Sequence, residues 1–300
     1  MVLAKASLAI TIHRGIKVPG ILRIRKFVLG LTMFLTILVA GLVGPLLYTV
    51  DPGVMIDRRY LPPMSRGILK QENIYPLGTD ALGRDVLAQF LHGIRGSLLV
   101  GSVAAGISLV LAIFLGTIAA VFGGLIDKVI LTVSEIFIII PAMILMMILA
   151  AYLRERNLWI VAFVIGITSW GGWARGFRSR TLSILSSDFI SLAMLSGASR
   201  FSIIVKDILP VISPYILAAF AMLFSFSIMS EVGLTIIGVG MTKDITLGLV
   251  LYIAQLYANI TQGIWWTFVL PTITIIAIYL SLYMIAISLD EYFSPKFATS

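Results

Sequence analysis

The sequence predicts an all-α integral membrane protein with six transmembrane helices. Of its 300 residues, 59% are hydrophobic and 12% are charged, whereas soluble domains carry about 25% charged residues. Several uncharged runs also approach or exceed the roughly 20 residues with which a helix crosses the hydrocarbon core. These features exclude an ordinary soluble domain and a disordered chain. The absence of cysteine also excludes disulfides, thiolate metal sites and iron–sulfur sites.

The uncharged runs give the spans in chain order. The first run is too long for a cleaved signal peptide, whose apolar core has about 7–15 residues. The last run begins at Ile245 and is too long for one span, so its polar first part, residues 245–263, is expected to be interfacial or re-entrant. The six predicted spans are residues 27–50, 96–126, 136–153, 157–174, 208–230 and 266–289.

The distribution of charge predicts the orientation, because cytoplasmic loops of membrane proteins are rich in Lys and Arg. With the N-terminus inside, 13 basic and 6 acidic residues face the cytoplasm, and 9 basic and 8 acidic residues face outward. Both termini are therefore expected to be cytoplasmic. The overall charge of +8 reflects this topology and does not indicate nucleic-acid binding.

This topology divides the chain into two tails, a first helix, an external loop and a core of five helices. The core contains one long cytoplasmic loop and a second external loop. The expected bounds are 1–26 for the basic cytoplasmic tail, 27–50 for the first helix, 51–95 for the external loop, 96–289 for the core with its cytoplasmic loop 175–213 and external loop 231–265, and 290–300 for the second cytoplasmic tail.

The cytoplasmic loop carries the strongest functional signal. Residues 187–210 are expected to form two short helices hinged at Gly197, the first capped by Ser187 or Asp188. Phe189 and Leu192 would share one face, and leaving either in water costs about 1.5–3 kcal/mol. Two interpretations fit this pattern: an amphipathic hairpin at the membrane surface, or a docking site for a partner protein.

The loop resembles one shared by the membrane subunits of type I ABC importers, whose pattern is E-A-A-x3-G-x9-I-x-L-P. Gly197 and the pair Leu209-Pro210 match the glycine-to-proline spacing. In that family the loop is the coupling helix, which docks on the ATPase. The sequence departs from the pattern at three positions, with Ser191 for Glu, Leu192 for the first Ala and Asp207 for Ile.

Further blocks resemble the C-type permease of dipeptide and oligopeptide importers, and the likeness runs over about residues 29–297. One departure is the external stretch Met241-Thr-Lys-Asp-Ile-Thr-Leu-Gly248, where relatives carry a Pro-rich segment with Trp-Gly. The similar blocks are Tyr75-Pro-Leu-Gly-Thr-Asp-Ala-Leu-Gly-Arg-Asp-Val-Leu-Ala88, Gly93-Ile-Arg-Gly-Ser-Leu98, Trp170 with Ala174-Arg175, and Glu231-Val-Gly-Leu-Thr-Ile-Ile-Gly-Val-Gly240.

The resemblance implies a permease subunit in the cell membrane of a prokaryote, forming half of a pathway for oligopeptides or oligosaccharides; some relatives carry nickel. It implies a second homologous permease, two ATPase domains that hold ATP and Mg²⁺, and an external substrate-binding protein as partners, with lipid around the spans. It implies no cofactor, metal or catalytic residue on this chain. The expected ATPase-coupling residues are Asp188, Phe189, Ser191, Leu192, Ala193, Gly197, Ala198, Leu209 and Pro210.

The sequence contains no phosphate-binding loop and no G-x-S-x-G or H-E-x-x-H motif, so ATP hydrolysis is expected on a partner and the chain is expected not to be an enzyme. A secondary transporter or channel working alone is the alternative. His13 and His92 lie on opposite sides of the membrane and share no metal site.

Three carboxylates have two interpretations each. Asp80 and Asp85 fit either a helix start capped by Thr79 or Asp80, which is favoured, or a cation site. Glu231 lies near a span end, where it can reach headgroups or pair; a proton relay is the alternative.

Overall fold

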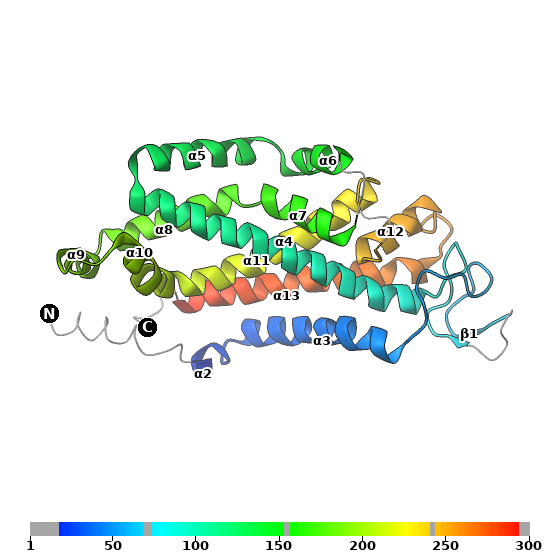
Figure 1. The fold of residues 1–300 in the computed structure, drawn as a ribbon. Coiled ribbons are helices and arrows are strands. Elements are labelled where there is room, and N and C mark those ends of the chain that lie inside the picture. Colours follow the sequence, from blue (N-terminus) through cyan, green and yellow to red (C-terminus); the bar gives the residue numbers. More distant parts are fainter. Residues whose placement is uncertain (1–17, 69–73, 153–156, 241–243, 294–300) are drawn as a thin grey trace.

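The computed structural model describes residues 18–68, 74–152, 157–240 and 244–293. Its long helices lie side by side, with a small β-hairpin at one end of the molecule and the short helices α9 and α10 at the other (Figure 1). Among the described residues, four helical runs are long and apolar enough to cross a membrane, and two bent helix pairs raise the number to six. The predicted all-α membrane architecture is confirmed, and the six predicted spans fall at the upper end of the four to six candidate spans.

The first span and the external segment that follows it precede the helical core. Helix α2 (Val18–Ile21) leads into α3 (Arg25–Leu47). Strands β1 (Ser65–Arg66) and β2 (Ile74–Tyr75) then pair antiparallel outside the bundle. Gly30 and Gly41 let α3 approach its neighbours closely, because a Cβ on Gly41 would lie 2.6 Å from Ile94 Cγ2 and one on Gly30 would lie 2.7 Å from Ser281 O.

Helix α4 (Val86–Phe122) is the central element of the fold and packs against α3, α7, α8 and α11. Its 37 residues extend about 55 Å at 1.5 Å per residue, well beyond the ~30 Å hydrocarbon core. The span was expected to begin at residue 96, but Asp85 caps the helix by accepting a hydrogen bond from Ala88 N at 2.8 Å. At the other end, Gly123 has φ +62° and stops α4 before residue 126.

The third span is broken. Residues 136–153 were expected to form one helix, but α5 (Gly124–Ile139) and α6 (Ala142–Tyr152) meet at 90°. Pro141 is the cause, because a proline disfavours helical geometry in the residue before it, and Ile140 is accordingly extended, with φ −72° and ψ 124°.

The fourth span is bent by 48° between α7 (Leu158–Thr168) and α8 (Gly171–Leu185). At the bend, the hydroxyls of Thr168 and Ser169 donate to carbonyls of the preceding turn, a pattern that often bends helices. The cytoplasmic loop expected from residue 175 is therefore helical up to Leu185.

The fifth span begins earlier than expected. Helix α9 (Asp188–Leu195) is followed by α10 (Arg200–Ile203), a π-helical turn (Ile204–Ile208) and α11 (Leu209–Ile236), which together run without a break from Arg200. Pro210 has no N–H to donate to the preceding turn, and Leu209 N instead bonds to Ile204 O. Pro210 therefore lies within a continuous helix instead of starting a new segment, and the beginning of the expected external loop 231–265 is helical.

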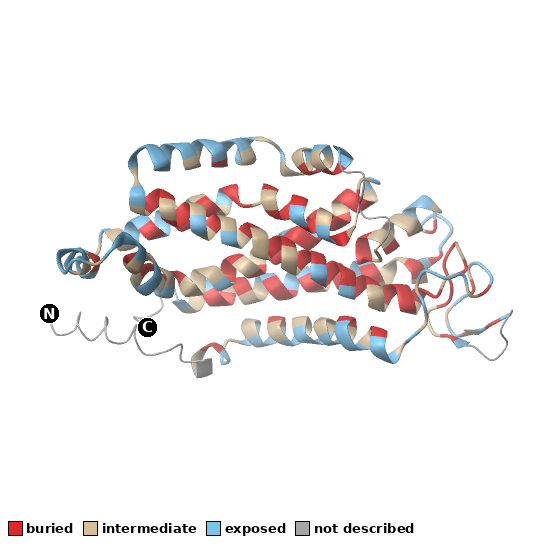
Figure 2. Cartoon of the chain, in the orientation of Figure 1, coloured by how far each residue is buried: buried red, intermediate tan, exposed pale blue. Residues whose placement is uncertain are grey.

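The last elements are α12 (Leu247–Leu256), the 3-10 turn η2 (Trp265–Thr267) and α13 (Val269–Phe293). Helix α12 has 10 residues and packs on α4 and α11, which fits the interfacial or re-entrant segment expected there. Buried residues concentrate on α4, α7, α11 and α13, whereas α3 and α5 are mostly exposed (Figure 2).

Candidate functional site

The α9–α10 hairpin, residues 187–203, has the two helices and the Gly197 hinge that the sequence predicts. Gly197 has φ +81°, and its N–H donates to Met194 O at 3.0 Å while Ala198 N donates to Ala193 O at 3.1 Å. This pair of bonds is the Schellman arrangement, in which a left-handed glycine closes a helix. The hinge thus follows from backbone chemistry and fixes the angle between the two helices.

The predicted cap of α9 is only partly correct. Ser187 occupies the N-cap position, but its side chain accepts no capping bond. Its hydroxyl instead donates to Ile184 O at 2.5 Å, tying the hairpin to the end of α8. Asp188 lies in the first turn, where a carboxylate interacts favourably with the helix dipole.

The hairpin is anchored by one apolar face and exposes the other. Ile190 and Ile203 are fully or almost fully buried and pack in one cluster with Phe177 of α8. The opposite face carries Leu192, which is 64% exposed, and Leu195, which is 84% exposed. The other exposed large apolar residues of the hairpin are Phe189, Met194 and Phe201.

Seven of the nine predicted coupling residues lie in this hairpin. Phe189, Ser191 and Leu192 are exposed, and Ala193 is half-buried. Leu209 and Pro210 lie outside the hairpin, at the start of α11. The sequence interpretation missed Leu195 and the buried anchor Ile190, although the i, i+3 spacing from Leu192 indicates the former.

Helix α8 carries the hairpin and is linked to the rest of the fold by arginines. Arg178 forms a two-pronged ion pair with Asp127 of α5, with both N···O distances at 2.5 Å. Arg175 pairs with Glu135 at 2.8 Å. On another side, the guanidinium of Arg180 lies 3.7 Å from the ring centre of Tyr215 in α11.

Close backbone packing reinforces these links. A Cβ on Gly116 of α4 would lie 2.4 Å from the carbonyl oxygen of Ala174 in α8. Through these contacts α8 joins the hairpin to α4, α5 and α11, and the hairpin is also continuous with α11 through α10.

At the opposite end of the molecule, the carboxylates near α4 form a structural network. The favoured interpretation, a helix start, is correct, but Asp85 is the cap instead of Thr79 or Asp80. Asp80 pairs with Arg84 at 2.7 Å and accepts from Gln89 Nε2 at 3.0 Å. No group of three potential metal ligands occurs among the described residues.

Glu231, for which headgroup contact, pairing and a proton relay were all considered, is fully buried on α11, where it contacts α4 and the start of α12. Three hydroxyls donate to its carboxylate: Thr246 at 2.7 Å, Thr235 at 3.1 Å and Ser97 at 3.3 Å. Thr246 is also the N-cap of α12. Glu231 therefore holds the start of α12 against the two long helices.

Comparison with known proteins assigns the chain to a family. Residues 112–299 match the profile of the binding-protein-dependent transport system inner membrane component. The chain belongs to this permease family. Such permeases are non-catalytic, multi-pass subunits of the inner membrane, and a binding-protein-dependent system works with an ATPase and a binding protein. This membership also excludes the stand-alone transporter or channel considered as an alternative.

Several relatives resemble the permease over most of its length. The oligopeptide transport system permease protein OppC of Lactococcus lactis subsp. lactis (strain IL1403) is 29% identical over 251 residues, covering 83% of this chain and 82% of the relative. OppC of Mycobacterium tuberculosis (strain H37Rv) is 32% identical, covering 67% and 69%. The dipeptide transport system permease protein DppC of Bacillus subtilis (strain 168) is 29% identical, covering 89% and 81%.

Proposed function

We propose that this permease forms half of the membrane pathway of a peptide importer, and that its α9–α10 hairpin is the docking site of the ATPase. A second permease of the same family completes the pathway, and two ATPase domains bind on the cytoplasmic side. The observation that carries the proposal is the hairpin itself, which is rigidly anchored yet exposes its other apolar face.

The exposed apolar face of the hairpin favours docking, because leaving apolar side chains in water is unfavourable. Each large apolar side chain left in water instead of being buried costs about 1.5–3 kcal/mol. The hairpin lies at the end of the molecule (Figure 1), beyond the long apolar helices. The Lys and Arg distribution favours a cytoplasmic position for this end, where an ATPase groove supplies a matching surface.

The proposed substrate class rests on the relatives, which are named as oligopeptide and dipeptide transport permeases. Of the stretch 241–248, which departs from the relatives' pattern, residues 244–248 lie at the opposite end of the molecule from the hairpin. Its residues 241–243 are outside the described residues. Oligosaccharide import remains the second substrate class to be tested.

The second permease is proposed from the surface of the spans. Helix α5 buries only Ser134 within this chain and exposes Leu125, Val129 and Ile139. An apolar helix face of this kind is covered in the membrane by lipid or by another subunit. In a pathway formed by two permeases, the second permease covers part of this α5 face.

The test compares Leu192→Glu with Ser191→Glu in the complete transporter reconstituted in liposomes. Both variants add the same charge to α9, one residue apart, but only the first removes an exposed leucine from the proposed docking face; the second installs the Glu that the family carries. We expect Leu192→Glu to reduce ATP-driven peptide uptake about tenfold or more, equivalent to about 1.4 kcal/mol, and to weaken ATPase co-purification.

Ser191→Glu is expected to retain uptake. Because Leu192 is mostly exposed in the isolated chain, thermal melting of that chain should not change in either variant. Equal uptake and equal ATPase association in wild type and both variants would refute the assignment of the hairpin as the docking site. Uptake of oligosaccharides instead of peptides would refute the substrate assignment alone.

A further inference from the structure

An open cavity of about 670 Å³ lies at the outer end of the helical core, between the end of α3, the outer turns of α4 and the starts of α7 and α12. Its lining carries charged side chains of both signs, Arg95 together with Asp51 and Asp244, and also His92. The other side chains that line this outer cavity are mostly apolar: Pro45, Val50, Pro52, Leu99, Leu158 and Ile245. The outer cavity therefore fits a ligand that is charged at one end and apolar at the other.

The charged groups of the outer cavity are not neutralised by one another. Arg95 is exposed, and no ion pair joins it to a carboxylate within the described residues. Asp51 Oδ1 accepts from Gly53 N at 2.8 Å. Asp244 Oδ2 accepts from Leu158 N at 2.7 Å. In each carboxylate, the second oxygen receives no hydrogen bond from the described part of the chain, so the cavity offers both a cation and carboxylate oxygens to a ligand.

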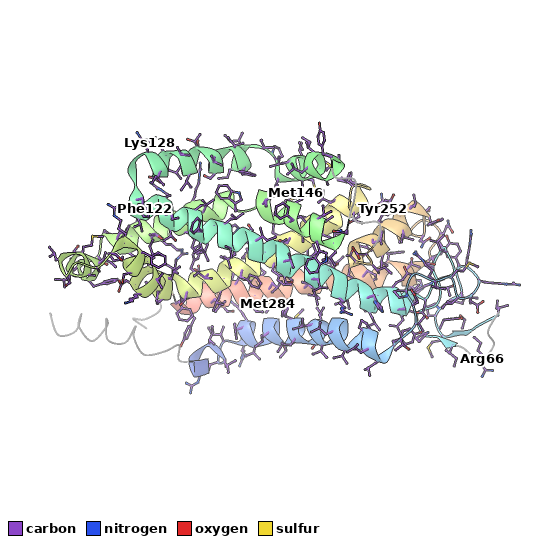
Figure 3. The ribbon with its side chains drawn as sticks, in the orientation of Figure 1. Arg66, Phe122, Lys128, Met146, Tyr252 and Met284 are labelled. Atoms are coloured by element: carbon purple, nitrogen blue, oxygen red, sulfur yellow. The ribbon has the colours of Figure 1, made fainter. Side chains whose placement is uncertain are left out.

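Arg95 lies at the outer edge of the hydrocarbon core. It is the last charged residue of α4 before the uncharged run 96–126. A long basic side chain near the end of a span extends its charged group to the membrane interface. Phe122, the last residue of α4, is labelled in Figure 3 toward the opposite end of the molecule. The outer cavity is therefore at the level of phospholipid headgroups in the outer leaflet.

A second cavity of about 530 Å³ is apolar and lies between α4 and α7, which are in contact along their length (Figure 1). Arg95 and Leu99 of α4 line the outer cavity, and Ser102, Gly106 and Val110 line the second. Spacings of three and four residues place all five on one face of α4. A Cβ on Gly106 would have nothing within 4 Å, so this α4–α7 groove is open at that position.

The α4–α7 groove extends over the depth of one membrane leaflet. At 1.5 Å per residue, Gly106 lies about 16 Å along the helix from Arg95. Half of the ~30 Å hydrocarbon core is about 15 Å. The groove therefore leads from the headgroup level to the middle of the bilayer, which is the path of an acyl chain in the outer leaflet.

We propose that the outer cavity and the α4–α7 groove form a binding site for one phospholipid with an ethanolamine headgroup. Arg95 pairs with the phosphate, and Asp51 and Asp244 receive the ammonium group through charge-assisted hydrogen bonds. One acyl chain lies in the groove beside Gly106. The inference goes beyond the proposed function and does not depend on the cargo of the importer.

The charges of the outer cavity select this headgroup over others. An anionic phosphoglycerol headgroup would bring a phosphate to Arg95 but would leave Asp51 and Asp244 facing additional negative charge. A choline headgroup carries a positive charge but has no N–H with which to donate a hydrogen bond. A zwitterionic peptide also carries both charges, but an apolar groove one leaflet deep is matched by an acyl chain.

The experiment identifies the phospholipid that stays bound to the complete transporter. The purified transporter is exchanged into detergent with an equimolar mixture of phosphatidylethanolamine, phosphatidylglycerol and phosphatidylcholine, and bound lipid is read by native mass spectrometry. Arg95→Gln removes the phosphate contact, and Gly106→Leu fills the groove. The matched control is Arg59→Gln, because Arg59 is also exposed in the external region but does not line the outer cavity.

Wild type is expected to retain phosphatidylethanolamine in about tenfold or greater excess over the other two lipids. Arg95→Gln and Gly106→Leu should each reduce its retention about tenfold, and Arg59→Gln should stay within about twofold of wild type. Asp51→Asn/Asp244→Asn keeps the oxygens that accept from Gly53 N and Leu158 N but removes both charges. This double variant should therefore lose the preference for phosphatidylethanolamine over phosphatidylglycerol.

The proposal is overturned if wild type retains the three lipids equally, or if Arg95→Gln and Gly106→Leu behave like the control. An unchanged preference in the Asp51→Asn/Asp244→Asn variant also overturns it. Because the chain has no cysteine, Gly106→Cys with a photoreactive label reports what occupies the groove when the other subunits carry no reactive cysteine. A crosslink to phospholipid supports the site, whereas a crosslink only to the second permease or to a transported peptide refutes it. Thermal melting checks that each variant folds.

Discussion

The ion pair between Arg178 and Asp127 allows a quantitative test of how the hairpin-bearing helix α8 is fixed to α5. The perturbation is a double-mutant cycle made of Asp127→Ala, Arg178→Ala and the double variant. A cycle isolates the interaction of the two side chains from the other effects of each substitution. The matched control is the same cycle on Lys26 and Glu291, an ion pair at the same end of the molecule.

The expected magnitudes follow from the geometry. The Arg178–Asp127 pair has two contacts at 2.5 Å, and its side chains are 26% and 18% exposed. Exposed pairs contribute about 0.2–1 kcal/mol, and shielded hydrogen bonds to charged groups about 1.5–3 kcal/mol, so a coupling energy of about 1–2 kcal/mol is expected. The Lys26–Glu291 pair has one 3.2 Å contact and is 60% and 40% exposed, so its coupling energy should stay below about 0.5 kcal/mol.

The assay is denaturant unfolding of the purified chain in detergent, followed by tryptophan fluorescence at low and high salt. Salt should weaken the control pair more than the partly buried pair. In the reconstituted transporter, Asp127→Ala should also lower the uptake obtained per ATP hydrolysed. Equal coupling energies for the two pairs would refute the reasoning that burial and the two-pronged geometry make Arg178–Asp127 the stronger link.

Three further predictions concern single positions. Gly116→Ala should lower the free energy of unfolding by about 1–3 kcal/mol, because its Cβ would meet the Ala174 carbonyl. The control Gly106→Ala, whose Cβ would have nothing within 4 Å, should change it by no more than about 1 kcal/mol, and an equal loss of stability in both variants would contradict the packing argument. Glu231→Ala should lower the free energy of unfolding by at least about 1 kcal/mol more than Glu231→Gln, because only Gln leaves an acceptor for the three hydroxyls. If Glu231→Gln were the less stable variant, the hydroxyl network would not stabilise the fold. Gly197→Ala should make the hairpin more sensitive to limited proteolysis than Gly197→Asn, since the left-handed conformation costs an alanine about 1–2 kcal/mol; equal cleavage would indicate that the hinge conformation is not required.

The sequence determined the class of the protein. Long uncharged apolar runs are stable as helices in a lipid bilayer, and six such runs predicted six spans. The hairpin was equally predictable, because Gly197 ends a helix through local backbone chemistry. Phe189 and Leu192 could be assigned to an exposed face because that assignment depends on helical spacing alone.

Helix boundaries and bends were less predictable. Asp85 caps α4 eleven positions before the uncharged run begins. Hydropathy does not detect this start, because it takes no account of the hydrogen bond between the Asp85 side chain and Ala88 N. Pro141 splits the third span with a 90° turn, while Pro210 is absorbed by a π-helical turn in a continuous helix. The outcome at each proline depends on the packing around it.

The direction in which charged side chains point was decided by the tertiary structure alone. The sequence places Asp57 and Arg58 side by side in one external loop, but the fold buries the first and exposes the second. Glu231 similarly receives hydroxyls from residues 134 and 15 positions away along the chain. Such partners come together only when helices pack, because burying a carboxylate requires donors that its own segment does not supply.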